Sequence, residues 1–169
     1  RWRYLKIFNE QSIFHSIIFL QEVIRKFPHR ILAVKTDNGI IFTNWGVGAN
    51  KRSDRTIKTQ HAFDEFCAQH KIIHYLIDPG KPAQNGTVER SHRSDQEAFY
   101  DRENFKDLLD LQSKLERWNI RYNNLRHCGL NGISPNKFLA ITGWVTRQMC
   151  VPKTKRTVGQ NYPFIFLDY

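Results

Sequence analysis

The sequence predicts an α/β fold in which helices cover a partly parallel sheet. Short apolar runs typical of buried strands alternate with segments whose apolar residues recur every three to four positions, the period of a helix. The chain has 169 residues, which is enough for one domain with a sizeable core but too few for a second. Hydrophobic residues make up 40% of the chain and aromatic residues 13%, a composition that argues against disorder.

Each element of the first half follows from a local pattern. Aromatic and branched residues mark strands, a continuous apolar run marks a buried strand, and Gly-, Asn- and Pro-rich stretches mark turns. Residues Ile13, Ile17, Leu20, Ile24 and Phe27 recur at helical spacing and predict one apolar helix face that ends near Pro28. The predicted elements are a strand at 2–8, a helix at 13–27, strands at 31–34 and 40–42, and a glycine-rich, then basic, loop at 44–58.

The second half is read in the same way. Thr59 is the expected cap of a helix that carries Phe63, Phe66 and Cys67 inward. A third set of apolar residues, from Phe105 to Tyr122, has the spacing of a long helix. The predicted elements are that helix after Thr59, a strand at 72–77, and helices at 88–100 and 105–122.

The charge balance points to a polyanionic partner. Lys and Arg number 26 against 16 Asp and Glu, a formal net charge of +10. A globular domain this basic usually binds nucleic acid, although charge alone leaves open a basic domain with no such partner. The three cysteines are far apart and suggest neither a disulfide framework nor a CxxC zinc site, so we expect a reducing, cytoplasmic setting. No apolar run has the length of a membrane span.

Two carboxylates are the candidate catalytic residues. Asp37 follows the predicted strand 31–34, and ligands of open α/β sheets bind beyond the carboxyl ends of strands. Asp-Asn-Gly is also a common turn between strands, so this tripeptide alone predicts only a turn. Glu89 falls in the first turn of a predicted helix, where an acidic residue is favourable to the helix dipole even without another role. Together they offer the oxygen ligands that two divalent cations need to promote phosphodiester chemistry.

Longer stretches of the sequence resemble a known family. The matching stretches are Thr36-Asp37-Asn38-Gly39, then Pro79-Gly80-x-Pro82-x-Gln84-Asn85-Gly86-x-Val88-Glu89-Arg90-Ser91-His92-Arg93, then Tyr122-Asn123-Asn124 and Ser134-Pro135. Over residues 1–140 the chain resembles the catalytic core of insertion-sequence transposases and retroviral-type integrases. The resemblance implies a ribonuclease-H-like three-layer fold with a mixed sheet, a site of two Asp and one Glu that uses Mg²⁺ or Mn²⁺, and cleavage and strand transfer of DNA in transposition or integration.

Carried over by position, the resemblance makes Asp37 the second Asp and Glu89 the Glu of that site. The first Asp of such sites lies on the strand that opens the domain, and residues 2–8 look like the third strand. The sequence begins at Arg1, and its only methionine is Met149. We therefore expect this chain to lack the first strands and the first Asp, with impaired catalysis. The alternative is a non-catalytic DNA-binding remnant of a transposase, and residues 141–169 are a tail of unknown role.

Basic residues are the expected DNA contacts. One cluster falls in the predicted loop and another surrounds Glu89. Contacts to phosphates would give salt-sensitive affinity with little sequence preference, while a loop that is merely solvated is the alternative for the first cluster. The expected DNA-binding residues are Lys51, Arg52, Arg55, Lys58, Lys81, Arg90, His92 and Arg93.

Other patterns are weaker. Cys67, His70 and His74 have a spacing that suggests zinc, but a helix face and a strand should not bring them together, so we expect no zinc site. Trp118 and Tyr122 continue an apolar stripe and are expected in the core rather than against bases. The expected partners are element ends and target DNA, with possible homo-oligomers and no membrane, at the nucleoid of a bacterial cytoplasm. A ribonuclease H acting on hybrids is disfavoured by the motif around Glu89.

Overall fold

The computed structural model describes residues 2–44, 60–78, 86–149 and 165–166. The chain forms two compact units, which we call the helical unit (Arg1–Ile7 and Arg102–Pro163) and the sheet unit (Phe8–Asp101 and Phe164–Tyr169). The predicted loop at 44–58 and the predicted cap Thr59 fall, except for Asn44, outside the described residues. The predicted division at residue 140 stays a prediction.

The sheet unit contains three parallel strands in the order β2-β1-β3: β1 (Ala33–Thr36), β2 (Ile73–Leu76) and β3 (Ile165–Phe166). Two parallel neighbours need a crossover, and α2 (Ala62–Gln69) provides it between β1 and β2. The predicted α/β class is confirmed. Among the strands that the structure describes every pairing is parallel, so the antiparallel part of a mixed sheet is not seen there.

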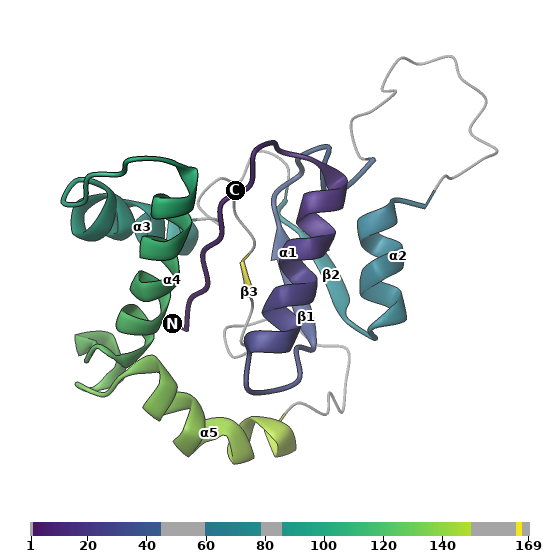
Figure 1. Cartoon of the computed structure of the whole chain (residues 1–169). Helices are drawn as coiled ribbons and strands as arrows, with labels where there is room; N and C mark the ends of the chain where they lie inside the picture. The colour runs from purple at the N-terminus through teal and green to yellow at the C-terminus, as the bar shows by residue number, and fades with distance from the viewer. Residues whose placement is uncertain (1, 45–59, 79–85, 150–164, 167–169) are drawn as a thin grey trace. The chain divides into compact units, whose positions relative to one another are not determined.

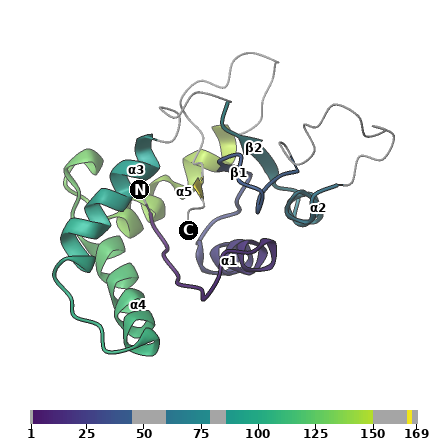
Figure 2. The same ribbon diagram turned by 90° about the horizontal axis from the view of Figure 1, so that it is seen from above.

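Helices α1 (Ile13–Lys26) and α2 lie side by side along one face of β1 and β2 (Figures 1 and 2). The predicted helix at 13–27 is confirmed, with Ser12 as its cap, but of the predicted apolar face only Leu20 is fully buried. The buried residues are Ser16, Phe19, Leu20 and Val23, whereas Ile13 is 38% exposed. Apolar residues occupy most of the circumference of this helix, so their spacing could not determine which side faces the sheet.

The predicted strand at 40–42 is wrong, because these residues form a turn. The backbone N–H groups of Phe42 and Thr43 both donate to the carbonyl oxygen of Gly39, at 2.9 and 3.2 Å. Phe42 is nevertheless buried, and its ring meets that of Phe63 on α2 edge-on at 5.2 Å. Phe42 thus packs against α2 without joining the sheet, whereas Ile40 is 69% exposed.

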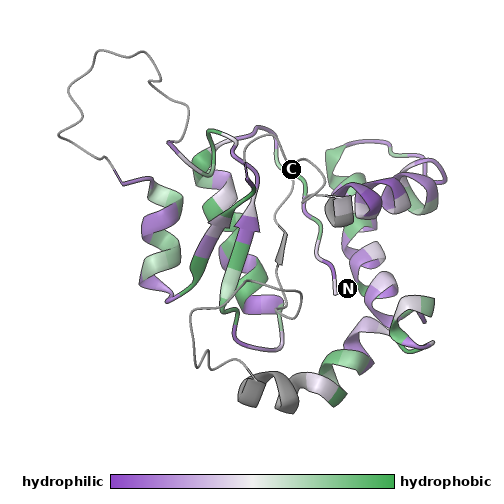
Figure 3. Ribbon diagram, turned by 180° about the vertical axis from the view of Figure 1, so that it is seen from behind, coloured by the Kyte–Doolittle hydropathy of each residue, from purple (hydrophilic) through white to green (hydrophobic). Residues whose placement is uncertain are grey.

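Helix α3 (Gly86–Asp95) continues into one π-helical turn, η2 (Gln96–Tyr100), and confirms the predicted helix at 88–100. Figure 3 colours α3 mostly hydrophilic. Phe99 in the π turn is buried. Single π turns within helices often occur at functional sites.

The helical unit contains α4 (Leu108–Asn124), the 3-10 turn η3 (Cys128–Leu130) and α5 (Pro135–Met149). Trp118 is buried as predicted, and Tyr122 is half-buried with the Arg3 guanidinium carbon 3.4 Å from its ring centroid. Nowhere in the described ranges is a helix both long and apolar enough to cross a membrane.

Residues 2–7 run beside α4, and the predicted strand at 2–8 is wrong. The N–H and C=O of Arg3 bond the side-chain amide of Asn123, at 2.9 and 2.6 Å, and those of Leu5 bond Asn119, at 2.9 and 2.7 Å. Four residues of a helix advance about 6 Å and two residues of an extended chain about 6.6 Å, so the two spacings match. The side chains of Asn119 and Asn123 therefore form the hydrogen bonds to Arg3 and Leu5 that the backbone of a neighbouring strand would form in a sheet.

Candidate active site

Asp37 directly follows β1, at the carboxyl end of the parallel strands, and is half-buried. Its Oδ1 accepts the N–H of Gly39 at 2.8 Å. The side-chain amide of Asn38 donates to the carbonyl oxygen of Ile77 at 3.1 Å, which ties the turn to the chain leaving β2. The sequence-based placement of Asp37 at a strand end is thus confirmed. Hydrogen bonds within and beside the short turn hold the Asp37 carboxylate in place.

Gly39 leaves the space that the Asp37 carboxylate occupies. A Cβ atom added to Gly39 would lie 2.9 Å from Oδ1 of Asp37, closer than real Cβ contacts. Among the described glycines only Gly132 has a positive φ, so the left-handed backbone that glycine permits is not what this position needs. The absent side chain lets the Asp37 carboxylate fold back onto the Gly39 N–H.

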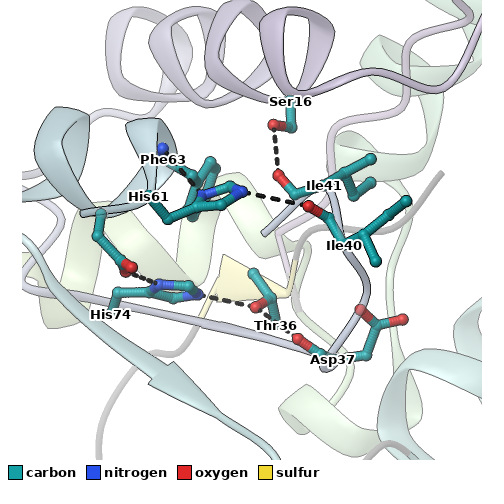
Figure 4. A network of polar contacts seen from close by, with 9 residues as sticks. Ser16, Thr36, Asp37, Ile40, Ile41, His61, Phe63 and His74 are labelled. Atoms are coloured by element: carbon teal, nitrogen blue, oxygen red, sulfur yellow. Dashed lines mark hydrogen bonds and ion pairs between the residues drawn. The ribbon is translucent and has the colours of Figure 1, made fainter. Parts of the chain in front are cut away.

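A chain of polar contacts reaches Asp37 from α2 and β2 (Figure 4). Asp64 on α2 accepts from Nδ1 of His74 at 2.6 Å, and Nε2 of His74 contacts Oγ1 of Thr36 at 2.8 Å. The Thr36 hydroxyl in turn donates to the carbonyl oxygen of Asp37 at 2.9 Å. The His74 side chain is only 6% exposed, and its ring meets that of Phe63 edge-on at 4.9 Å.

Two further contacts hold the rest of the turn. His61, the residue that caps α2, accepts the N–H of Phe63 through Nδ1, so its Nε2 carries the proton and donates to the carbonyl oxygen of Ile40 at 3.2 Å. The hydroxyl of Ser16 on α1 lies 3.4 Å from the carbonyl oxygen of Ile41. Side chains from α1, α2 and β2 therefore converge on the turn that presents Asp37 (Figure 4).

The sequence does not predict this network, because the only pattern that includes His74 is its zinc-like spacing from Cys67 and His70. Cys67 is buried in α2, and burial, followed by the nearby Asp64, raises the pKa of its thiol to about 12, which keeps it neutral. His70 is exposed, and its ring contacts the carbonyl oxygen of Phe66 in its own helix. The structure thus uses both ring nitrogens of His74 for Asp64 and Thr36. The register, with Val34 opposite His74, brings His74 near Thr36, but the two are 38 residues apart.

Glu89 lies in the first turn of α3, as predicted, and its side chain is exposed. Residues 79–85, which connect β2 to α3, lie outside the described residues, as does Lys81. The convergence of Asp37 and Glu89 on one site therefore stays a prediction.

The basic residues of α3 are exposed. Arg90, His92 and Arg93 all face solvent, and Nε of Arg93 donates to Glu97 at 2.8 Å. This hydrogen bond and the charge of Glu97 raise the pKa of Arg93. An ion pair this exposed is worth little, so a phosphate can compete with Glu97 for Arg93. The predicted contacts Lys51, Arg52, Arg55 and Lys58 lie outside the described residues.

The donor chemistry of Asp37 and Glu89 suits hard divalent cations, because carboxylate oxygens are the ligands that Mg²⁺ and Mn²⁺ prefer. Only Oδ1 of Asp37 takes part in a hydrogen bond within the described ranges, which leaves Oδ2 for a cation. In those same ranges no three His, Cys, Asp or Glu side chains gather closely enough to hold a metal ion by themselves.

Comparison with known proteins supports the same interpretation. Residues 70–135 match the family model described as "Integrase core domain". The "Insertion element IS476 uncharacterized 39.2 kDa protein" of Xanthomonas euvesicatoria is 30% identical over 109 residues, which are 64% of this chain and only 27% of that protein. The catalytic core domain of BIV integrase has a TM-score of 0.57 at 18% identity, over 85% of this chain and 80% of that chain. The chain therefore shares the ribonuclease-H-like α/β fold of that integrase core, and its residues 70–135 are similar to an integrase core domain.

Proposed function

We propose that this protein acts on DNA in transposition or integration, through divalent-metal-dependent cleavage and strand transfer of phosphodiesters. The observation that carries the proposal is the position of Asp37, whose half-buried carboxylate stands at the carboxyl end of β1 on a turn fixed by Gly39. The match to an integrase core over residues 70–135 includes Glu89, the second proposed ligand.

Asp37 and Glu89 would hold Mg²⁺ or Mn²⁺. Bound there, the cation supplies activation of the attacking oxygen and stabilisation of the leaving oxygen. The protein's own part is to fix the carboxylates before DNA arrives, which the turn around Asp37 does through its hydrogen bonds to Gly39 and Thr36. The exposed cations Arg90 and Arg93 would neutralise nearby phosphates.

Residues 1–169 contain two of the three carboxylates that the resemblance implies. We therefore propose that this polypeptide alone binds DNA better than it cuts it. Element ends and target DNA as partners, assembly into homo-oligomers and location at the bacterial nucleoid belong to the same proposal.

The test uses labelled duplexes that carry element ends, incubated with residues 1–169 and Mg²⁺ or Mn²⁺. We expect binding that weakens steeply with salt and little cleavage. Cleavage that is lost in Asp37→Asn would show that residues 1–169 contain an active site and would reject the remnant alternative. Salt-insensitive binding, or none at all, would contradict the assignment of DNA as the partner. A parallel RNA–DNA hybrid substrate would expose a ribonuclease H.

A further inference from the structure

The polar chain Asp64–His74–Thr36 ends on the carbonyl oxygen of Asp37, the residue proposed as a cation ligand. His74 and Thr36 are both almost inaccessible, with the His74 side chain 6% and Thr36 2% exposed. Burying polar groups costs free energy unless they are hydrogen-bonded, and aliphatic side chains would fill the same space under α2 without that cost. A buried histidine and a buried threonine at these positions therefore depend on their hydrogen bonds.

The geometry indicates that use. Thr36 has a single hydroxyl proton, and it points to the peptide that joins Asp37 to the turn. Because that proton is used, the Thr36 oxygen accepts from Nε2 of His74 while Nδ1 donates to Asp64, so all three bonds form together when both ring nitrogens carry protons. Figure 4 shows the Asp37 carboxylate on the opposite side of that residue from the bond to Thr36. Fixing the Asp37 carbonyl thus restricts the backbone of Asp37, and with it the directions in which the Asp37 carboxylate can point.

We propose that His74 is a positioning residue for Asp37: with Asp64 it holds the Thr36 hydroxyl against the Asp37 carbonyl and so sets the direction of the Asp37 carboxylate. The inference rests on the proposed role of Asp37 as a cation ligand. His74 itself touches neither cation nor DNA in this account. The effect of His74 on the proposed cation site passes through Thr36 and the peptide group that contains the Asp37 carbonyl.

The test is a Mn²⁺ titration of the ¹⁵N-labelled 169-residue chain, in which broadening of the Asp37 and Gly39 amide signals reports cation binding without any need for activity. His74→Leu removes both ring contacts, and we expect about fivefold weaker Mn²⁺ binding, the factor that corresponds to one lost hydrogen bond. His74→Gln keeps an amide within reach of Thr36 and should restore binding to within about twofold of the original chain.

Two variants complete the series. Thr36→Val keeps the shape of the side chain but removes the hydroxyl, so it should match His74→Leu, and it keeps the inference testable if His74→Leu does not fold. His70→Leu is the matched control, because His70 is an exposed histidine whose ring contacts Phe66 of the neighbouring helical turn. Hydrogen exchange of the β1 and β2 amides in every variant shows whether the sheet stays intact.

The outcomes separate the inference from the proposed function. If Asp37→Asn abolishes Mn²⁺ binding while His74→Leu and Thr36→Val, both folded, bind as the original chain does, the positioning role is wrong and the cation site stands. If Asp37→Asn also leaves Mn²⁺ binding unchanged, the proposed function fails first. Weakened binding in His74→Leu and Thr36→Val, with recovery in His74→Gln, supports the inference.

Discussion

The pairing of residues 2–7 with α4 predicts a large effect for a single amide. Asn123 is 5% exposed and makes two hydrogen bonds to the backbone of Arg3. Each such bond contributes about 1 kcal/mol, and a backbone group left buried without a partner adds to the loss, so Asn123→Leu should cost about 2–3 kcal/mol. That is a substantial part of the 5–15 kcal/mol by which small domains are stable.

The assay is hydrogen exchange at the Arg3 amide, measured by NMR. A local loss of about 2 kcal/mol corresponds to roughly thirtyfold faster exchange. Asn124→Leu is the control, because Asn124 is exposed and its amide bonds the carbonyl oxygen of Ile120 within the same helix. Equal exchange rates of the Arg3 amide in Asn123→Leu and Asn124→Leu would refute the role of the Asn123 side chain. Once Asn123 is lost, Asn119→Leu should cost less than it does alone, since the two residues anchor one segment.

Three further predictions concern the sheet unit. Gly39→Ala should weaken Mn²⁺ binding but barely change the urea midpoint, because the new Cβ displaces only the tip of Asp37; a binding constant like that of the original chain would contradict this. Glu97→Gln should strengthen DNA binding, while Arg93→Gln should weaken it and reduce the salt slope by about 1; filter binding at several salt concentrations checks both. The raised pKa of Cys67 means that folding favours the neutral thiol, so its contribution to stability is complete below the ordinary pKa of 9.0 and is lost as the pH rises towards about 12. Cys67→Ala should therefore show a flatter decline of stability over that range in urea titrations, and parallel declines would be evidence against it.

The elements that the sequence predicts correctly are those set by local patterns. The helices α1, α3 and α4 and the strands β1 and β2 each follow from apolar spacing with a turn or cap beside it, and such patterns act within a dozen residues. The placement of Asp37 could be predicted for the same reason, since a buried strand followed by Asn-Gly specifies where the chain turns.

The features that escaped prediction depend on distant partners. Residues 2–8 have the composition of a strand, but the Asn side chains of α4, more than a hundred positions away, decide what Arg3 and Leu5 bond. Within 40–42, Ile41 and Phe42 are buried in a turn, and Phe42 packs against Phe63 of α2, so the apolar run resembles a strand in the sequence without forming one. The contact between His74 and Thr36 exists only once the register of β1 and β2 is known.

The central claim is that Asp37 and Glu89 bind the same divalent cation site. It is tested most directly by a Mn²⁺ titration of the ¹⁵N-labelled chain that follows the amides of 37–39 and 89–90 together. The claim predicts that both segments broaden with one dissociation constant, and that either Asp37→Asn or Glu89→Gln removes the broadening from both. Broadening of one segment alone, or of either segment in the absence of the other carboxylate, would contradict it.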